Sequence, residues 1–331
     1  MRLLFKIQVR PYHRHFIATH LPTLPTMKNM LLYLVTVLIW GSTWFAIEFQ
    51  LGVVAVEVSL LYRFAIAAVL MWLFCWWRKL DMHFTLRQHG FILLLASLNF
   101  AVNFLFIYQA QQYLTSAMTA IAFTTMLLMN IVNTRLFFGK PVAKRIYFGA
   151  LLGIAGIVVL FWPDLDGIDL TNTSLLGLIL ILSGALSASF GNMVSVRNSR
   201  ENMPIMQVNA WGMLYGSLVL LAAVLFKGHS FNFSTEPSYI ISLLYLAIFG
   251  SVIAFASYFA LLKQIGPEKA SYTIVLFPLV AVVLSTLFEG FQWTSYTFSG
   301  FALVLLGNAI VLTPFDRIRA LFSREQPKLV S

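Results

Sequence analysis

Ten runs of apolar residues, each about 20 residues long, follow one another along this chain of 331 residues. A helix of that length crosses the hydrocarbon core of a bilayer. Hydrophobic residues make up 60% of the chain and charged residues only 10%, unlike a soluble domain. The runs predict an all-α integral membrane protein with ten transmembrane helices, embedded in the lipid bilayer. They cover residues 30–49, 56–77, 90–110, 116–138, 146–162, 175–196, 205–226, 239–262, 270–288 and 296–314.

The basic residues gather on one predicted side of the membrane. With the amino terminus placed in the cytoplasm, the tails and loops on that side hold 20 of the 22 Lys and Arg. Of the other two, Lys227 falls on the opposite side and Arg63 falls inside a span. Short cytoplasmic loops of membrane proteins carry such an excess, so both termini are predicted to be cytoplasmic. This placement explains the net charge of +10, and no nucleic-acid partner is predicted.

One stretch of 21 residues occurs twice, at Leu136 to Gly156 and again at Leu287 to Gly307. In register, the two copies share six identities, where apolar composition alone gives roughly two. Small residues at this spacing also occur wherever membrane helices pack closely, but the shared register favours a duplicated unit. The repeated glycines stand ten and then seven residues apart: Gly139, Gly149 and Gly156 in one copy, Gly290, Gly300 and Gly307 in the other.

Each copy closes a set of five spans, and an odd number of spans means that the second set enters the membrane upside down. The chain is therefore predicted to hold two inverted five-helix repeats, at 28–162 and 175–314, joined by an extracytoplasmic linker at 163–174. Carriers built this way bind a small-molecule substrate near mid-membrane, between the halves. Residues 1–27 are predicted to be a disordered extension or an upstream start-site assignment. The reason is that Met27 begins a stretch, MKNMLLYLV, that is more typical of the start of a membrane protein. Residues 315–331 form a basic cytoplasmic tail.

Arg63 is the most informative single residue, because it lies roughly 15 Å inside the second span. A guanidinium at that depth costs several kcal/mol unless it is paired or hydrated, so it is expected to face the protein interior. One interpretation is that it binds a carboxylate or another anion. The other is structural: it ties helices together, or pairs with Glu48 or Glu57.

Other polar and aromatic residues of the spans are candidates for substrate binding. The first span carries Trp40 and Ser42 on either side of Gly41, and Asn99 and Asn103 lie on one face of the third. Each has a structural alternative, since aromatic rings pack against lipid or core and asparagines form helix-to-helix hydrogen bonds. The remaining candidates are Phe106, Ser187, Ser257, Tyr258 and Tyr272.

Coupling to an ion has few candidates in this sequence. No Asp, Glu, His or Lys lies deep in a predicted span, and all six histidines fall in loops or tails. We therefore expect exchange, facilitated diffusion, or proton coupling through Glu48 or Glu57 near the outer boundary. Cys75 is the single cysteine, which excludes an internal disulfide and a cysteine metal cluster, and no cofactor or metal is predicted.

The combination of motifs resembles the EamA-type carriers of the drug/metabolite transporter superfamily. The residues that match are Trp40-Gly41-Ser42, Arg63, Pro278, Phe288-Glu289, Gly300 and Gly307. The resemblance implies ten helices in the inner membrane, a central cavity, and export of amino acids or other small metabolites. The first copy departs from the pattern, because Leu127 stands opposite Pro278 and Phe138 stands opposite Glu289.

Two other classes of membrane protein remain as alternatives. A channel or a sensor without carrier activity has the same composition. A membrane-embedded enzyme is less favoured, because no histidine lies at depth and no His-Glu pair or aspartate-rich diphosphate motif is present. No particular oligomeric state is predicted.

Overall fold

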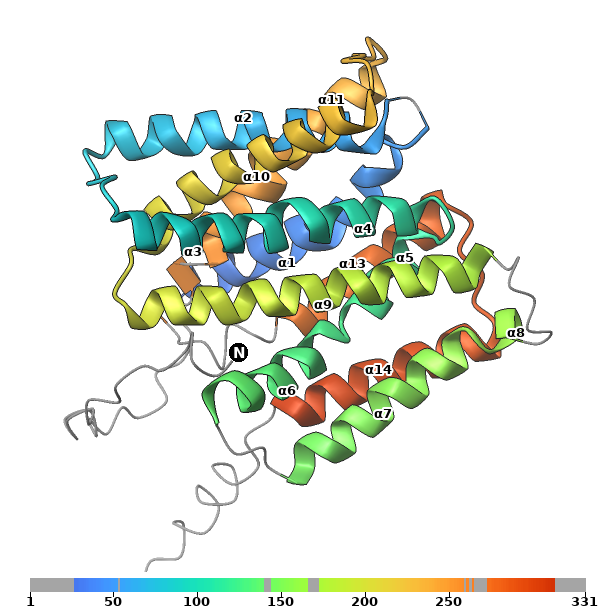
Figure 1. Cartoon of the computed structure of the whole chain (residues 1–331). Coiled ribbons are helices and arrows are strands. Elements are labelled where there is room, and N and C mark those ends of the chain that lie inside the picture. Colours follow the sequence, from blue (N-terminus) through green and yellow to red (C-terminus); the bar gives the residue numbers. More distant parts are fainter. Residues whose placement is uncertain are drawn as a thin grey trace, which may run out of the picture.

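A computed structural model describes residues 27–312, except 53, 140–143, 166–172, 259, 262–263 and 265–272. The described part consists of helices joined by loops (Figure 1). Most of the predicted linker, the basic tail and the extension before Met27 lie outside the described residues, as does Tyr272.

The first five spans match the predicted apolar runs closely. They are α1 (Met27–Glu48), α2 (Val56–Trp77), α3 (Leu86–Ala96) continued by η2 (Ser97–Val102) and α4 (Asn103–Gln111), α5 (Ser116–Phe123) with α6 (Met126–Phe138), and α7 (Lys144–Leu160). A single turn, α8 (Trp162–Leu165), follows them.

The second set of five repeats the order of the first. It consists of α9 (Thr173–Arg200), α10 (Ile205–Lys227), α11 (Pro237–Tyr245) continued by η3 (Leu246–Ile253), α13 (Thr273–Phe288) and α14 (Ser295–Leu312). Among the described residues, eight helical runs are long and apolar enough to cross a membrane, and the shorter apolar helices α7 and α13 complete ten. The predicted fold of an all-helical membrane protein with ten spans is confirmed.

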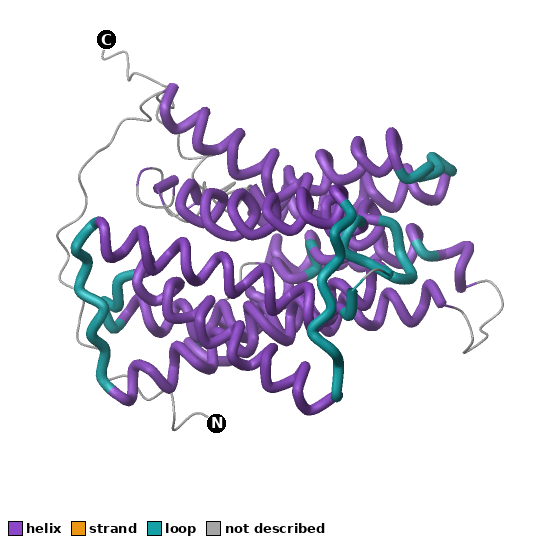
Figure 2. Tube along the Cα trace, turned by 90° about the horizontal axis from the view of Figure 1, so that it is seen from above, coloured by secondary structure: helices purple, strands orange, loops and turns teal. Residues whose placement is uncertain are grey.

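The loops gather at the two ends of the bundle (Figure 2). We call the end where α1 begins the first end and the end where α1 stops the second end. Helix α14 stops at the first end, so α1 and α14 begin and finish the described chain on the same side (Figure 1).

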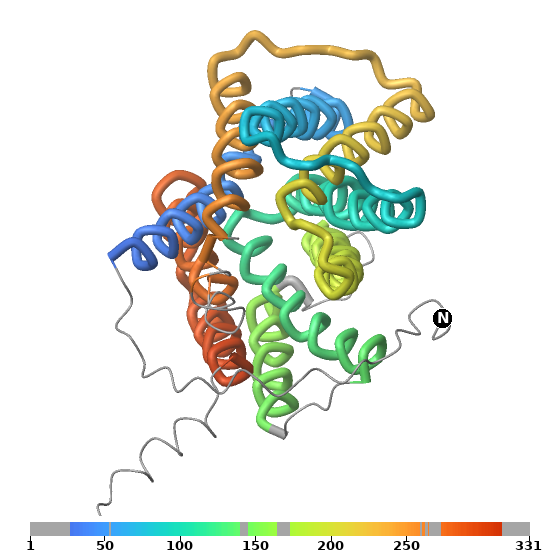
Figure 3. The backbone as a smooth tube through the Cα atoms, turned by 90° about the vertical axis from the view of Figure 1, so that its left-hand side faces the viewer, coloured from blue at the N-terminus to red at the C-terminus, as the bar shows by residue number. Residues whose placement is uncertain are grey.

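The helix contacts repeat under exchange of the two halves. Helix α1 packs against α13 as α9 packs against α6, and α1 packs against η3 as α9 packs against η2 and α4. The pairs α2 with α10 and α7 with α14 map onto themselves. Figure 3, which looks along the bundle, shows α7 and α14 side by side at one edge. This pairing is what a two-fold relation between inverted repeats requires.

The repeated glycines lie where α7 and α14 touch. A Cβ on Gly149 would come within 2.7 Å of the carbonyl oxygen of Gly307, and a Cβ on Gly156 within 2.7 Å of that of Gly300. Exchanging the halves turns one of these contacts into the other. Glycine is required at each position because the backbones approach too closely for any side chain.

The first glycine of each copy has a different role. Gly139 follows α6 and Gly290 follows α13, with φ angles of 67° and 68°. This left-handed conformation ends a helix and is costly for residues with a Cβ. The duplicated pattern therefore encodes a helix end followed by two close contacts.

The fourth span is not the regular counterpart of the ninth. It breaks between α5 and α6, where the hydroxyls of Thr124 and Thr125 donate to the carbonyls of Ile121 at 2.7 Å and Ala122 at 2.8 Å. Threonine bonds of this kind bend helices. In contrast, α13 stays a single helix around Pro278. The break therefore does not need the proline that the first copy lacks.

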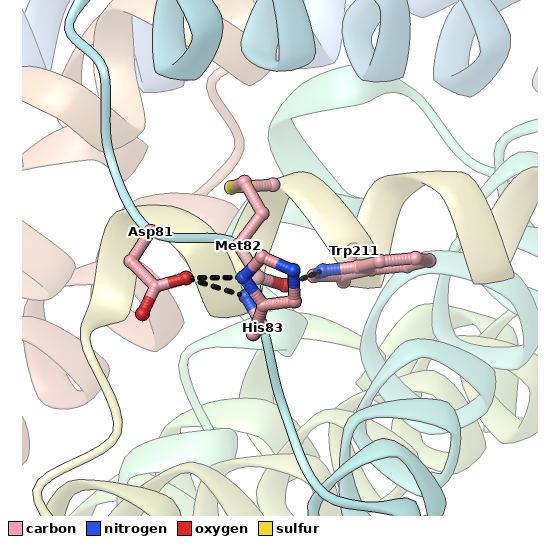
Figure 4. A network of polar contacts seen from close by, with 4 residues as sticks. All are labelled: Asp81, Met82, His83 and Trp211. Carbon is pink, nitrogen blue, oxygen red and sulfur yellow. Dashed lines mark hydrogen bonds and ion pairs between the residues drawn. The ribbon is translucent and has the colours of Figure 1, made fainter.

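The loop between α2 and α3 is fixed to α10 at the first end. The indole nitrogen of Trp211 donates to the carbonyl oxygen of Met82 at 3.0 Å (Figure 4). The carboxylate of Asp81 accepts from the backbone N–H of His83 at 3.0 Å and lies 2.7 Å from its ring nitrogen Nδ1. The hydrogen bond from the backbone of His83 has the largest effect and the contact with its ring the next, and together they hold the pKa of Asp81 below its usual range.

We expect Gly156→Ala to destabilise the protein by about 1–3 kcal/mol, because the added methyl group clashes with the backbone of α14. The midpoint of thermal unfolding in detergent measures the effect. Gly153→Ala, in the same helix, is the matched control, since its Cβ would lie 3.4 Å from a Leu128 methyl group, an ordinary contact. Equal midpoints for the two variants would contradict the assignment of the contact.

Candidate substrate site

The Trp40-Gly41-Ser42 segment, in the middle of the continuous helix α1, contacts two neighbouring spans. The Trp40 ring lies 5.4 Å from the Phe255 ring and 5.0 Å from the Tyr258 ring, centroid to centroid. A Cβ on Gly41 would lie 2.7 Å from the carbonyl oxygen of Phe277 in α13. Trp40 therefore faces the eighth span while Gly41 lets α13 approach.

Ser42 extends the contact with the eighth span. Its hydroxyl donates to the carbonyl oxygen of Leu38 at 2.7 Å and lies 2.6 Å from the hydroxyl of Tyr245. Ser257 is buried in the same helical run as Tyr258, which extends from Pro237 to Tyr258. Four of the sequence candidates, Trp40, Ser42, Ser257 and Tyr258, thus belong to one pair of spans, α1 and the eighth.

The other candidates of the predicted cluster lie between the third span and α9. The hydroxyl of Ser187 donates to the carbonyl oxygen of Leu98, inside η2, at 2.8 Å. A Cβ on Gly191 would lie 2.2 Å from the amide oxygen of Asn99. Ser187 and Asn99 therefore take part in packing between helices, which is the structural alternative to substrate binding given above for the asparagines.

Asn103 and Phe106 lie against the next glycine of α9. A Cβ on Gly184 would lie 3.2 Å from Cβ of Phe106 and 3.5 Å from the amide oxygen of Asn103. The amide oxygens of Asn99 and Asn103 are buried and accept no hydrogen bond from the described residues. Glycine Cα–H groups offer them only weak contacts.

The two clusters are equivalent under the exchange of halves. One joins α1 to the eighth span, and the other joins α9 to the third span, which are the corresponding helices. In Figure 3, α1 and α13 lie on one side of the bundle and α4 and α9 on the other, with the fourth span between them. The structure therefore divides the predicted site into two matching walls rather than a single cluster.

Some residues of this region were not among the site candidates. Tyr245 and Phe255 contact Ser42 and Trp40, and the amide nitrogen of Asn192 in α9 donates to the amide oxygen of Asn130 in α6 at 3.2 Å. The two asparagines are detectable as polar residues in apolar spans. Nothing in the sequence separates Tyr245 and Phe255 from the many other aromatic residues.

Arg63 is held at the junction of the second, third and eighth spans. Its side chain is nearly inaccessible, with an exposed fraction of 2%. Its guanidinium donates to the hydroxyls of Ser251 and Tyr108, both at 3.3 Å, and lies 4.6 Å from the Phe104 ring centroid. Helix α2 begins at Val56, so Arg63 lies about 10 Å from its start, closer than predicted. These contacts favour the structural interpretation.

The carboxylates near the second end have separate partners. Glu57 lies 2.5 Å from the amine of Lys227 and 3.5 Å from the ring of His229, which joins α2 to the end of α10. Glu48 accepts from the amide of Gln111 at 2.8 Å. Within the described residues, Arg63 therefore pairs with neither glutamate.

A hollow of about 570 Å³ lies elsewhere, at the start of α14. Its lining consists of Trp293, Thr294, Ser295 and Phe298. Aromatic rings at a helix end of a membrane protein are typical of the membrane–water interface. This hollow is separate from the two walls.

A bundle of two inverted five-helix halves, with polar and aromatic side chains on equivalent walls between them, defines a membrane transporter with inverted repeats. Comparison with known protein families identifies the family of this transporter. The chain belongs to the EamA-like transporter family, whose model matches residues 27–162 and again 175–313. The predicted family is confirmed.

Several relatives extend over most of the chain. The uncharacterized inner membrane transporter YedA of Escherichia coli K12 is 31% identical over 294 residues, covering 84% of this chain and 90% of YedA. The uncharacterized transporter YoaV of Bacillus subtilis is 25% identical, covering 88% of this chain and 99% of YoaV. Protein PagO of Salmonella typhimurium is 26% identical, covering 81% and 87%.

The fold also matches a solved structure described only as a crystal structure of a protein. The match has a TM-score of 0.63 and 18% sequence identity, and it covers 88% of this chain and 98% of that chain. It supports the architecture alone.

We expect Arg63→Ala to destabilise the protein by about 3 kcal/mol, the cost of deleting a large buried side chain. The loss leaves a cavity between three spans, and the midpoint of thermal unfolding in detergent measures it. Arg135→Ala, which removes an exposed arginine of α6, serves as the control. An Arg63→Ala protein that unfolds with the wild type would remove the structural role.

Proposed function

We propose that the protein is a secondary carrier that exports amino acids or other small metabolites across the inner membrane by alternating access. The family membership supports transport, and the name of the relative YedA supports the inner membrane. Export and this substrate class follow from the resemblance to the EamA-type carriers.

The unequal packing of the fourth and ninth spans carries this proposal. Seven of the eight residues of α5 are buried, whereas in the thirteen residues of α6 only Leu127 and Asn133 are. The equivalent helix α13 has buried residues along its whole length. Alternating access requires that the two repeats, which share one sequence pattern, pack differently in a given state. When the repeats exchange their packing, the opposite end of the carrier opens.

The direction of opening follows from the same comparison. α6 lies at the first end and is packed loosely, while α13, its counterpart in the second repeat, lies at the second end and is packed tightly. The sequence assigns the first end to the cytoplasm, because the basic loops and tails lie there. The structure is therefore a cytoplasm-facing state in this proposal.

The wall formed by α1 and the eighth span is the better substrate wall. Trp40 and Tyr258 are half-buried, so a ligand can reach part of their rings, while Ser42 and Tyr245 supply hydroxyl groups beside them. Asn130 and Asn192, also half-buried, offer amide groups on the opposite side. A small molecule with an apolar part and hydrogen-bonding groups fits this combination.

We expect the purified protein in proteoliposomes to show counter-flow of at least one member of a panel of amino acids, nucleosides and organic anions. Trp40→Ala should lower the initial rate at least about tenfold, equivalent to about 1.4 kcal/mol of binding or transition-state stabilisation. Trp76→Ala, which removes an exposed ring with an exposed fraction of 79%, is the matched control.

The same assay separates the carrier from its alternatives. Flux without counter-flow would indicate a channel, and ligand-dependent thermal stabilisation without any flux would indicate a sensor. Either result would overturn the proposed function.

The proposed orientation predicts the accessibility of single cysteines. In a Cys75→Ser background, a membrane-impermeant maleimide added to intact cells should label Phe231→Cys, in a loop at the second end. It should leave Glu201→Cys, in a loop at the first end, unlabelled until the cells are opened. The reverse pattern would place the termini outside.

A further inference from the structure

The last turn of α9 carries a buried arginine without an acidic partner. Arg197 has an exposed fraction of only 4%. A buried arginine is normally paired, because a charge away from water is costly without a counter-charge. Among the described residues Arg197 forms no ion pair, and neither does Glu201, the carboxylate four residues further along the chain. The positive charge at this end of α9 is therefore not neutralised by a contact with the protein.

The guanidinium of Arg197 has one covered face and one unused edge. The Phe91 ring of α3 covers the face, with its centroid 3.6 Å from Cζ. Nη1 donates to the amide oxygen of Asn198 at 3.0 Å and to Sδ of Met203 at 4.0 Å. Nε and Nη2, on the other edge, donate to no described residue. Two parallel N–H groups of this kind bind a phosphate or carboxylate with two hydrogen bonds.

Asn198 places a further unused donor beside this guanidinium. Its exposed fraction is 2%, and its amide nitrogen is buried without an acceptor in the described part of the chain. Arginine only donates, so the amide atom that faces Nη1 is the oxygen, and the unpaired atom is the NH₂ group. Arg197 and Asn198 therefore bring together hydrogen-bond donors that lack an acceptor. An anion supplies what this arrangement lacks.

Other arginines lie at the same end of the bundle. Figure 1 shows that α3 begins at the end where α6 and α9 stop. Arg200, also in the last turn of α9, lies over the Phe138 ring of α6 with its Cζ 4.1 Å from the centroid. Arg87 precedes Phe91 by four residues, so it lies on the same face of α3 and nearer the first end. The surroundings of Arg197 are therefore positively charged.

The helix dipole of α9 explains only part of this arrangement. Basic residues in a last turn stabilise the negative end of a helix. That effect accounts for the positive charges of Arg197 and Arg200. It does not require the deep burial of Arg197, and it leaves the amide nitrogen of Asn198 without a partner. These two features distinguish a binding site from a solvated helix end.

We propose that the junction of α3 and α9 at the first end binds a phosphate group, held by the Nε and Nη2 groups of Arg197 and the amide nitrogen of Asn198. The basic loops predict that this end faces the cytoplasm. Two sources offer the same chemistry there: the head group of an anionic phospholipid of the inner leaflet, and a free phosphate. The site lies apart from the two walls and does not depend on the proposed transport. Because α3 and α9 belong to different repeats, the bound group also connects the two halves.

The test uses the full chain, purified without lipid in an uncharged detergent and a phosphate-free buffer. The midpoint of thermal unfolding is measured with inorganic phosphate and with short-chain phosphatidylglycerol, because a ligand of the folded state raises it. Potassium chloride at equal ionic strength and uncharged detergent at equal concentration are the references. A rise with phosphatidylglycerol alone supports the site and identifies a lipid head group. A rise with both supports the site and identifies the phosphate itself. No rise with either probe overturns the proposal.

Two variants test the proposed donors. Arg197→Lys keeps the charge but loses the paired N–H groups, and Asn198→Asp replaces the free donor with a carboxylate that competes for Arg197. Each should weaken the apparent affinity at least about tenfold, as the loss of a charge-assisted hydrogen bond does. Asn198→Asp also supplies the missing counter-charge, so it keeps the test available if Arg197→Lys does not fold.

Arg78→Gln is the matched control, since it removes an exposed positive charge at the same end of the bundle. Its affinity should stay within about twofold of the wild type, because a screened surface charge contributes little at a distance. Unchanged affinity in both Arg197→Lys and Asn198→Asp would overturn the proposed site. So would an equal loss in Arg78→Gln, which would show that net charge alone attracts the probe.

Discussion

The contact between the backbones of α7 and α14 is the constraint on which the two-fold arrangement depends. In lipid, apolar side chains gain little by leaving the bilayer, so helices associate through close packing and hydrogen bonds. Gly149 against Gly307 and Gly156 against Gly300 supply that close packing with one pattern used twice. The same approach recurs inside the bundle, where Gly41 admits α13 and Gly184 and Gly191 admit the third span. Small residues therefore set which helices touch, and the polar residues are arranged around those contacts.

Much of the fold could be predicted from the sequence because bilayer thickness fixes the length of each span. The apolar runs located all ten spans, and the repeated glycines indicated the duplication. Three features could not be predicted from periodicity. The π-helical turns η2 and η3, the break at Thr124–Thr125 and the choice of Ser251 and Tyr108 as the partners of Arg63 depend on how neighbouring helices pack against each backbone.

The candidate site could be predicted only in part, for a related reason. Residue type and depth identified Trp40, Ser42, Arg63 and Asn103, but the rotation of each helix decides what a side chain faces. The structure places Asn103 against α9 and Trp40 against the eighth span. The structure places Tyr258 beside Trp40, its role in substrate binding stays a prediction, and Tyr272 lies outside the described residues.

The two π-helical turns occupy equivalent spans, and both contribute to the surroundings of Arg63. Ser251 lies in η3 and Tyr108 lies one turn beyond the start of α4, which continues η2. A π turn holds an additional residue within a helix, so converting one to α-helical geometry would rotate everything beyond it. Such a rotation would carry Tyr108 or Ser251 away from the guanidinium and leave a charge in the protein interior without that hydrogen bond. Arg63 therefore couples the helical geometry of two spans from opposite halves, because its guanidinium bonds to one hydroxyl of each span. A change of winding in either span would remove one of the two hydrogen bonds of the same side chain.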